Sequence, residues 1–371
     1  MTMRRINKDI GVANARERPV SRSMILLLST SAILLAGCGG GGEGAGDDLD
    51  KQVVSLETEV PLRDPAYQPA AGGSLLALTE DGNALAKLEV EEPEGGFFGP
   101  NEQDPRLVLS RGENLEGEGA GENIALDRFK EGRAFVPQPD LDHIQSIQTD
   151  DLLDIRTFDA GEPASRVALS GPLDAIYALS ADGKTVTAVD LGGFDPVAEK
   201  RVNGGEETLI ETSPEGDDEF WLAGPEGVSF HAFGTDPAPE GELSLDAASL
   251  AVDAEDAERA YASEAGTGRV VAVEPEDGGL GIVAEADLGD EILYLAAEPG
   301  RLYAATPSKL VALDSATLET IRVVELSAAG EATGSGAGAE PSGIAVGEEG
   351  VFVTLKGEPR VLLVAKPPNQ G

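Results

Sequence analysis

The sequence has few of the residues on which catalytic and metal sites usually depend. Its 371 residues include one cysteine (Cys38), one tryptophan (Trp221) and two histidines (His143 and His231). A single cysteine excludes an internal disulfide framework, and a single tryptophan excludes a regular tryptophan repeat around a quinone cofactor. No Gly-x-Ser-x-Gly segment is accompanied by plausible triad partners. We therefore predict no catalytic residues and no cofactor.

Aromatic and basic residues are also scarce. Aromatic residues make up 4% of the chain, so Val, Leu, Ile and Ala must fill most of its core. The 27 Lys and Arg residues face 68 Asp and Glu residues, which gives a formal net charge of −41. A field of this sign repels nucleic acid and anionic lipid headgroups, so we predict no nucleic-acid partner. A solvated acidic surface explains the charge more simply than a specific basic partner does.

The first 37 residues have the pattern of an export signal. Residues 1–23 are basic, and an apolar run of about thirteen residues follows, too short to cross roughly 30 Å of hydrocarbon as a helix. No second run of 18 apolar residues occurs. Because the apolar run ends in Leu35-Ala36-Gly37-Cys38, the segment resembles the lipobox of bacterial lipoproteins.

The resemblance to lipoproteins implies diacylglycerol on the Cys38 thiol and cleavage before this residue. We then expect a signal peptide at residues 1–37 and a flexible, acidic, glycine-rich tether at residues 38–51. The protein would be exported and attached by its N-terminal lipid to the outer face of the cell membrane. The alternative is an ordinary secretory signal with an incidental cysteine.

Hairpin patterns recur along the rest of the chain. Each pairs two alternating apolar segments around a turn that contains Gly, Pro or Asp, which indicates antiparallel strands. The units begin near residues 74, 133, 175, 219, 259, 301 and 351. Most intervals are about 40–45 residues, the length of a four-stranded propeller blade. The two longest contain apparent insertions, at residues 91–122 and 328–340.

The repeat resembles the YVTN-type β-propellers. Blades of that type have an aromatic residue and Val, a polar hairpin, a strand ending near Asp-Thr, and Gly-x-Pro before the next blade. Matching segments are Phe135-Val136, Gly161-Glu162-Pro163, Leu313-Asp314-Ser315-Ala316-Thr317 and Phe352-Val353-Thr354. The resemblance covers about residues 130–365 and implies an all-β propeller of four-stranded antiparallel blades. Seven hairpins predict seven blades, with six or eight as alternatives.

The last hairpin leaves too little chain for a fourth strand. Residues 52–60 have a strand-like pattern and stand directly after the tether. We predict that this strand closes the ring as the outer strand of the last blade, which removes an exposed sheet edge. The propeller would then span residues 52–365, followed by a C-terminal tail at residues 366–371.

One hairpin contains the best candidates for a metal site. Asp140, Asp142 and His143 lie together, and alternation would place both carboxylates on one side, an arrangement that would suit a divalent ion. The competing interpretation is an ordinary turn whose Asp residues bond to local amides, and we favour it. His231 lies between Phe230 and Phe233, where a hydrogen-bonded core or edge residue is expected.

The usual functional face of a propeller carries the loops between the second and third strands of its blades and the loops that enter the next blade. Besides the Asp140 hairpin, the candidate binding residues on these loops are Glu264, Thr267, Thr306, Ser308, Lys356 and Glu358. Because no catalytic set is visible, we predict a non-catalytic binding or scaffolding module for a protein, glycan or small molecule. The alternatives are a divalent-metal-dependent extracytoplasmic hydrolase or lactonase, and a metal-binding carrier protein.

Overall fold

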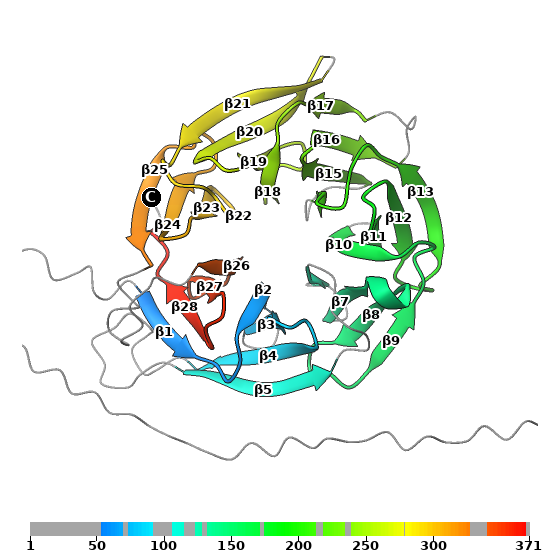
Figure 1. Ribbon diagram of the computed structural model, residues 1–371, viewed down its shortest axis with the longest axis vertical. Coiled ribbons are helices and arrows are strands. Elements are labelled where there is room, and N and C mark those ends of the chain that lie inside the picture. Colours follow the sequence, from blue (N-terminus) through cyan, green and yellow to red (C-terminus); the bar gives the residue numbers. More distant parts are fainter. Residues whose placement is uncertain are drawn as a thin grey trace, which may run out of the picture. The chain divides into compact units, whose positions relative to one another are not determined.

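The computed structural model contains antiparallel sheets arranged in a ring (Figure 1). It describes residues 53–69, 73–91, 106–114, 123–127, 132–170, 174–212, 218–233, 239–277, 279–326 and 340–368. These residues form seven four-stranded sheets, here called blades 1 to 7 in chain order. None of the described segments is a helix long and apolar enough to cross a membrane.

Within blades 1 to 6, the four strands follow one another from the centre of the ring outwards (Figure 1). Blade 1 has β2 (Leu62–Gln68), β3 (Ser74–Thr79), β4 (Ala84–Glu91) and β5 (Arg106–Asn114). Blade 2 has β6 (Ala125–Leu126), β7 (Arg133–Gln138), β8 (His143–Gln148) and β9 (Ile155–Phe158). Blade 3 has β10 (Ala164–Ser170), β11 (Ala175–Ser180), β12 (Thr185–Asp190) and β13 (Pro196–Arg201).

The next three blades repeat this order. Blade 4 has β14 (Leu209–Glu211), β15 (Glu219–Gly224), β16 (Gly227–Ala232) and β17 (Gly241–Leu243). Blade 5 has β18 (Ala247–Val252), β19 (Ala260–Glu264), β20 (Arg269–Glu276) and β21 (Gly279–Asp287). Blade 6 has β22 (Tyr294–Glu298), β23 (Arg301–Ala305), β24 (Lys309–Asp314) and β25 (Thr320–Glu325). The seven predicted hairpins are the second and third strands of the seven blades.

Blade 7 joins the two ends of the described chain. It has β26 (Pro341–Val346), β27 (Val351–Leu355) and β28 (Arg360–Val364), and its outer strand is β1 (Val53–Glu57). β1 pairs with β28 in an antiparallel register that sets Leu56 opposite Val361 (Figure 1). The predicted closure of a seven-bladed ring by an N-terminal strand is confirmed.

The core consists of seven apolar clusters, one in each seam between neighbouring blades. The seam between blades 7 and 1, for example, contains Leu56, Tyr67, Phe352 and Leu363. The other six clusters join each remaining pair of adjacent blades in the same way. Because a blade packs on both faces, inner strands such as β27 are buried at every position, which explains their continuous apolar sequences.

One sequence prediction missed a strand. Residues 91–122 read as an acidic insertion, but the structure places β5 within them, as the outer strand of blade 1. An outer strand needs only one pairing partner, and the Gly- and Glu-rich segments on both sides concealed its short apolar pattern.

Candidate functional site: the central cavity

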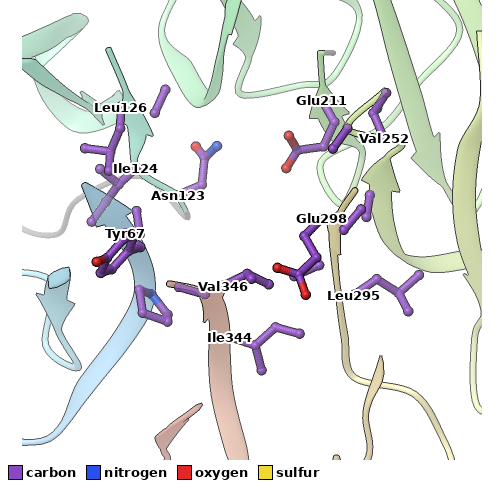
Figure 2. Close-up of a pocket in the computed structure, with 18 of the residues that line it drawn as sticks. Tyr67, Asn123, Ile124, Leu126, Glu211, Val252, Leu295, Glu298, Ile344 and Val346 are labelled. Carbon is purple, nitrogen blue, oxygen red and sulfur yellow. The ribbon is translucent and has the colours of Figure 1, made fainter. Parts of the chain in front are cut away.

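A cavity of about 510 Å³ lies at the centre of the ring (Figure 2). Its lining includes residues of the innermost strand of every blade. Many of the lining residues are aliphatic, and polar atoms of the backbone and side chains face the cavity as well; the aliphatic residues include Ile124, Leu126, Val252, Leu295, Ile344 and Val346. A concave space of this size with a few convergent polar groups lies within the range of small-molecule sites.

The ionised side chains of the lining are three carboxylates and one ammonium. Glu211 ends β14, Glu298 ends β22, and Glu348 follows β26. Figure 2 shows the carboxylates of Glu211 and Glu298 projecting into the same space as the amide of Asn123. The ammonium belongs to Lys366. These carboxylates lie at the end of the inner strands from which the chain turns into the second strand of each blade.

Glu298 is held by three donors. The Tyr303 hydroxyl donates to its Oε1 atom at 2.5 Å, and Lys366 Nζ donates to its Oε2 atom at 2.5 Å. Arg301 Nη1 forms an ion pair with Oε1 at 3.6 Å. Burial, together with the hydrogen bond and charge of Glu298, raises the pKa of Tyr303, so this hydroxyl stays protonated. Both carboxylate oxygens therefore have donors within the chain.

The C-terminal segment places Lys366 in the cavity. Arg322 Nη1 donates to the carbonyl oxygens of Ala365 at 3.1 Å and Lys366 at 3.3 Å. Arg301 Nη2 donates to the carbonyl oxygen of Pro368 at 3.0 Å. Two arginines of blade 6 thus hold the backbone that follows β28, and the Lys366 side chain extends from it to Glu298.

Two polar side chains of the lining have structural roles. Asn123 Nδ2 donates to the carbonyl oxygen of Val167 at 2.5 Å, and its Oδ1 atom accepts from the Val167 amide at 3.0 Å. Thr212 Oγ1 donates to the carbonyl oxygen of Leu169 at 2.5 Å. The inner edge of β10 faces the cavity, and these side chains satisfy backbone groups that would otherwise lack partners there.

The opposite end of the inner strands carries mixed charge. Arg63 and Asp64 form an ion pair near the start of β2. Burial, followed by the charges of Asp64 and Glu340, raises the pKa of Tyr294 to about 12, whereas Arg63 and Arg166 act in the other direction. Charges of both signs meet at this end, while carboxylates predominate at the other.

The predicted Asp140 hairpin forms a turn at the end of blade 2. Residues Pro139–Leu141 form a short 3-10 helix, η2, and Asp142 adopts a left-handed conformation with φ 53°. Asp140 and Asp142 are exposed. His143 Nδ1 lies 3.1 Å from the carbonyl oxygen of Leu141. Since that oxygen only accepts, Nδ1 is the donor, and the buried Nε2 atom has no hydrogen-bond partner among the described residues.

The other predicted loop residues take part mainly in local turns. Thr267 Oγ1 donates to the carbonyl oxygen of Glu264 at 3.0 Å, and the Lys309 amide donates to Thr306 Oγ1 at 3.1 Å. Glu358 pairs with Arg360. Backbone atoms of Ser308 and Lys356 bond to Leu326 and Glu340 respectively.

These loops lie at the opposite end of the strands from the cavity carboxylates, because successive strands in a blade are antiparallel. Ligand binding by the loops remains a prediction. Within the described part of the chain, no group of three or more His, Cys, Asp or Glu side chains could share a metal ion. Cys38 lies outside the described residues.

His231 occupies a seam of the core, as the sequence indicated. It is 2% exposed, its ring stacks on Phe220 with centroids 5.0 Å apart, and Nε2 lies 2.9 Å from Ser229 Oγ. Burial, and secondarily the charge of Lys200, lowers its pKa to about 4. The imidazole is therefore neutral at neutral pH.

Sequence reasoning missed the residues around the cavity. Glu211, Glu298, Glu348 and Lys366 belong to no motif, and three of them are separated by whole blades along the chain. One signal was present: Glu298 stands directly before the Pro299-Gly300 turn, where an innermost strand ends. In blade 6 this residue lines the cavity.

Comparison with known proteins supports the fold and leaves the family open. No family model matches the sequence, and no curated protein matches it. Among solved structures, 1323 chains match. One of them is a streptogramin B lyase structure, with a TM-score of 0.60 and 12% sequence identity, covering 84% of this chain and 97% of that chain. At this identity the likeness shows a shared β-propeller fold and carries no residue roles.

Proposed function

We propose that this protein is an exported lipoprotein whose propeller binds a small molecule in its central cavity without transforming it. The observation that carries the binding role is the cavity itself, which is lined by residues of every blade and has three glutamates at one end. The lipobox at Cys38 and the likeness to YVTN-type blades support an exported, lipid-anchored propeller at the outer face of the cell membrane.

The hydrogen bonds of Glu298 argue against a role for this residue as a general base. A general base needs a carboxylate oxygen open to the substrate, whereas both oxygens of Glu298 accept hydrogen bonds from Tyr303 and Lys366. Asn123 and Thr212 are likewise engaged with backbone groups of blade 3. These side chains shape the cavity.

Binding is tested by a thermal-shift screen of small molecules on the full chain in mild detergent. A ligand bound in the cavity raises the melting temperature by mass action. Val346→Phe, which adds a ring inside the cavity and narrows it, should reduce the shift, and Ile344→Phe serves as a second obstructing variant. Val197→Phe, at a position 63% exposed on β13, is the matched control. Equal shifts in all variants would place binding elsewhere, and chemical change of the recovered ligand would contradict the non-catalytic role.

Anchoring is tested separately by labelling cells with an alkyne fatty acid. The wild-type chain should incorporate the label and sediment with membranes, whereas Cys38→Ala should do neither. Equal labelling of the two proteins would refute lipidation at this residue.

A further inference from the structure

The described residues after β28 form a strap between two blades, here called the C-terminal strap (residues 365–368). Lys366 follows the third strand of blade 7, yet its Nζ atom donates to Glu298 of blade 6 at 2.5 Å. Arg301 and Arg322 of blade 6 donate to three backbone carbonyl oxygens of the same segment. Figure 1 shows the chain passing from β28 towards blade 6. The last residues of blade 7 are thus held by its neighbour.

The C-terminal strap is stiff and cannot pair as a strand. Pro367 and Pro368 have no backbone N–H, and their rings fix φ. Proline also disfavours a helical conformation of the residue before it, so Lys366 is constrained as well. Hydrogen bonds to the strap therefore depend mainly on its carbonyl oxygens and on the lysine ammonium, and their partners are accordingly arginines and a carboxylate. A segment of this kind docks or leaves as one unit.

The strap also lies outside the apolar cluster that joins blades 6 and 7. That cluster includes Val364, the last residue of β28, but none of the four described residues that follow it. Among these four, Pro367 is buried, Ala365 and Lys366 are half-buried, and Pro368 is exposed. Polar contacts provide much of the hold, and their net contribution is modest because water competes for the same groups. We expect the strap to be released more easily than the inner strands of the ring.

The strap supplies one residue to the wall of the central cavity. Lys366 is the one residue of the described lining that belongs neither to an innermost strand nor to a segment beside one. It lies against Glu298, at the end of β22, where the carboxylates of the lining gather. Departure of the strap would remove this part of the wall.

We infer that the C-terminal strap is a gate of the central cavity. Docked on blade 6, it narrows the cavity at the carboxylate end; undocked, it admits solutes there. This inference rests on the proposed binding function and adds how access to the binding site is controlled.

The test measures access to the cavity by alkylation of a single thiol. Cys38 is the one cysteine of the chain, so Cys38→Ala combined with Val346→Cys places the only thiol on the cavity wall. The rate of its reaction with uncharged N-ethylmaleimide is measured on the full chain in mild detergent. Lys366→Ala should raise this rate about tenfold, equivalent to about 1.4 kcal/mol, because it removes a charge-assisted hydrogen bond of the docked strap. An unchanged rate would overturn the gate.

Arg322→Met provides an independent arm, because it releases the backbone of the strap and leaves every described lining residue in place. It should also raise the rate about tenfold. Arg269→Met, which breaks an ion pair with Glu285 in blade 5, is the matched control and should leave the rate unchanged. If Lys366→Ala acts and Arg322→Met does not, the lysine side chain alone limits access, and the strap is not a gate.

General loosening of the ring is measured with the same reagent. Ala178→Cys, used in place of Val346→Cys, puts the thiol in the seam between blades 2 and 3, at a position 2% exposed. Its rate should stay unchanged in the strap variants, and equal acceleration at both positions would overturn the gate. Alkylation needs no ligand, so the gate can fail while the thermal-shift screen still finds binding, and the screen can fail while the gate stands.

Discussion

Substitution of Leu56 tests how far the first strand stabilises the ring. Leu56 is 1% exposed and packs in the seam between blades 7 and 1, with Leu62, Phe352 and Val361 around it. Truncation of a buried leucine to alanine removes its transfer free energy and leaves a cavity, which costs about 2–5 kcal/mol. We therefore expect Leu56→Ala to lower the free energy of unfolding by about 3 kcal/mol.

The size of the expected shift in melting temperature follows from the length of the domain. At about 2 cal/mol/K of unfolding entropy per residue, a propeller of roughly 300 residues loses about 1.5 °C for each kcal/mol, so Leu56→Ala should melt about 4–5 °C lower. Scanning calorimetry of the full chain measures this shift. Val60→Ala, at a position 42% exposed just beyond β1, is the control and should shift the melting temperature by less than 1 °C.

A double-mutant cycle links the effect to ring closure. Leu56 lies opposite Val361 in the β1–β28 ladder. If β1 is docked in solution, Leu56→Ala and Val361→Ala should together cost less than the sum of the two single variants, because the residues share one contact. Strict additivity, or a Leu56→Ala protein as stable as wild type, would refute closure of the ring through this strand.

Two further positions give sharp expectations. Gly183 has φ +71°, and a Cβ there would lie 1.9 Å from the Gly205 carbonyl oxygen, whereas Gly357 has φ +70° and open space around it. Gly183→Ala should therefore lower the melting temperature clearly more than Gly357→Ala does. Equal losses in the two variants would show that the close approach does not exist. Burial and the charge of Lys200 lower the pKa of His231 to about 4, whereas an unfolded histidine titrates near about 6.5, so the unfolded chain binds more protons between these pH values. The free energy of unfolding should therefore fall as the pH drops from 6.5 to 4. The melting temperature of His231→Phe, whose ring can still stack on Phe220, should fall less steeply over this range. Identical pH profiles of the two proteins would contradict a buried neutral imidazole.

The fold could be predicted because its repeating unit is local. The second and third strands of a blade form a tight hairpin, so β11 and β12 carry their signal within one short stretch around the turn that contains Gly183. Closure by β1 was predictable for a different reason. Blade 7 lacked a fourth strand at the C-terminal end, and an unpaired edge on β28 would have been unfavourable.

The cavity could not be predicted in the same way. Its residues lie near the ends of inner strands, some as short as the two-residue β6, and they meet only when the ring is complete. Glu211 and Glu298 belong to blades separated by a third blade, so no spacing rule connects them. The position of Lys366 depends on Arg301 and Arg322 holding the backbone after the last strand, an interaction that no local pattern indicates.

The pairing of β1 with β28 has a consequence for the order of events during folding. The two strands set residues 56 and 361 side by side, so the first strand to be synthesised has no partner until nearly the whole chain exists. Six blades can assemble from strands that follow one another, but the seventh must wait for the last hairpin. Until then the ring is open and β28 lacks its neighbour, a state in which strand edges are exposed to other chains. The slowest and most aggregation-sensitive step of folding should therefore be the docking of residues 53–57. Substitutions that weaken this strand should slow closure of the ring even where they leave the folded structure unchanged.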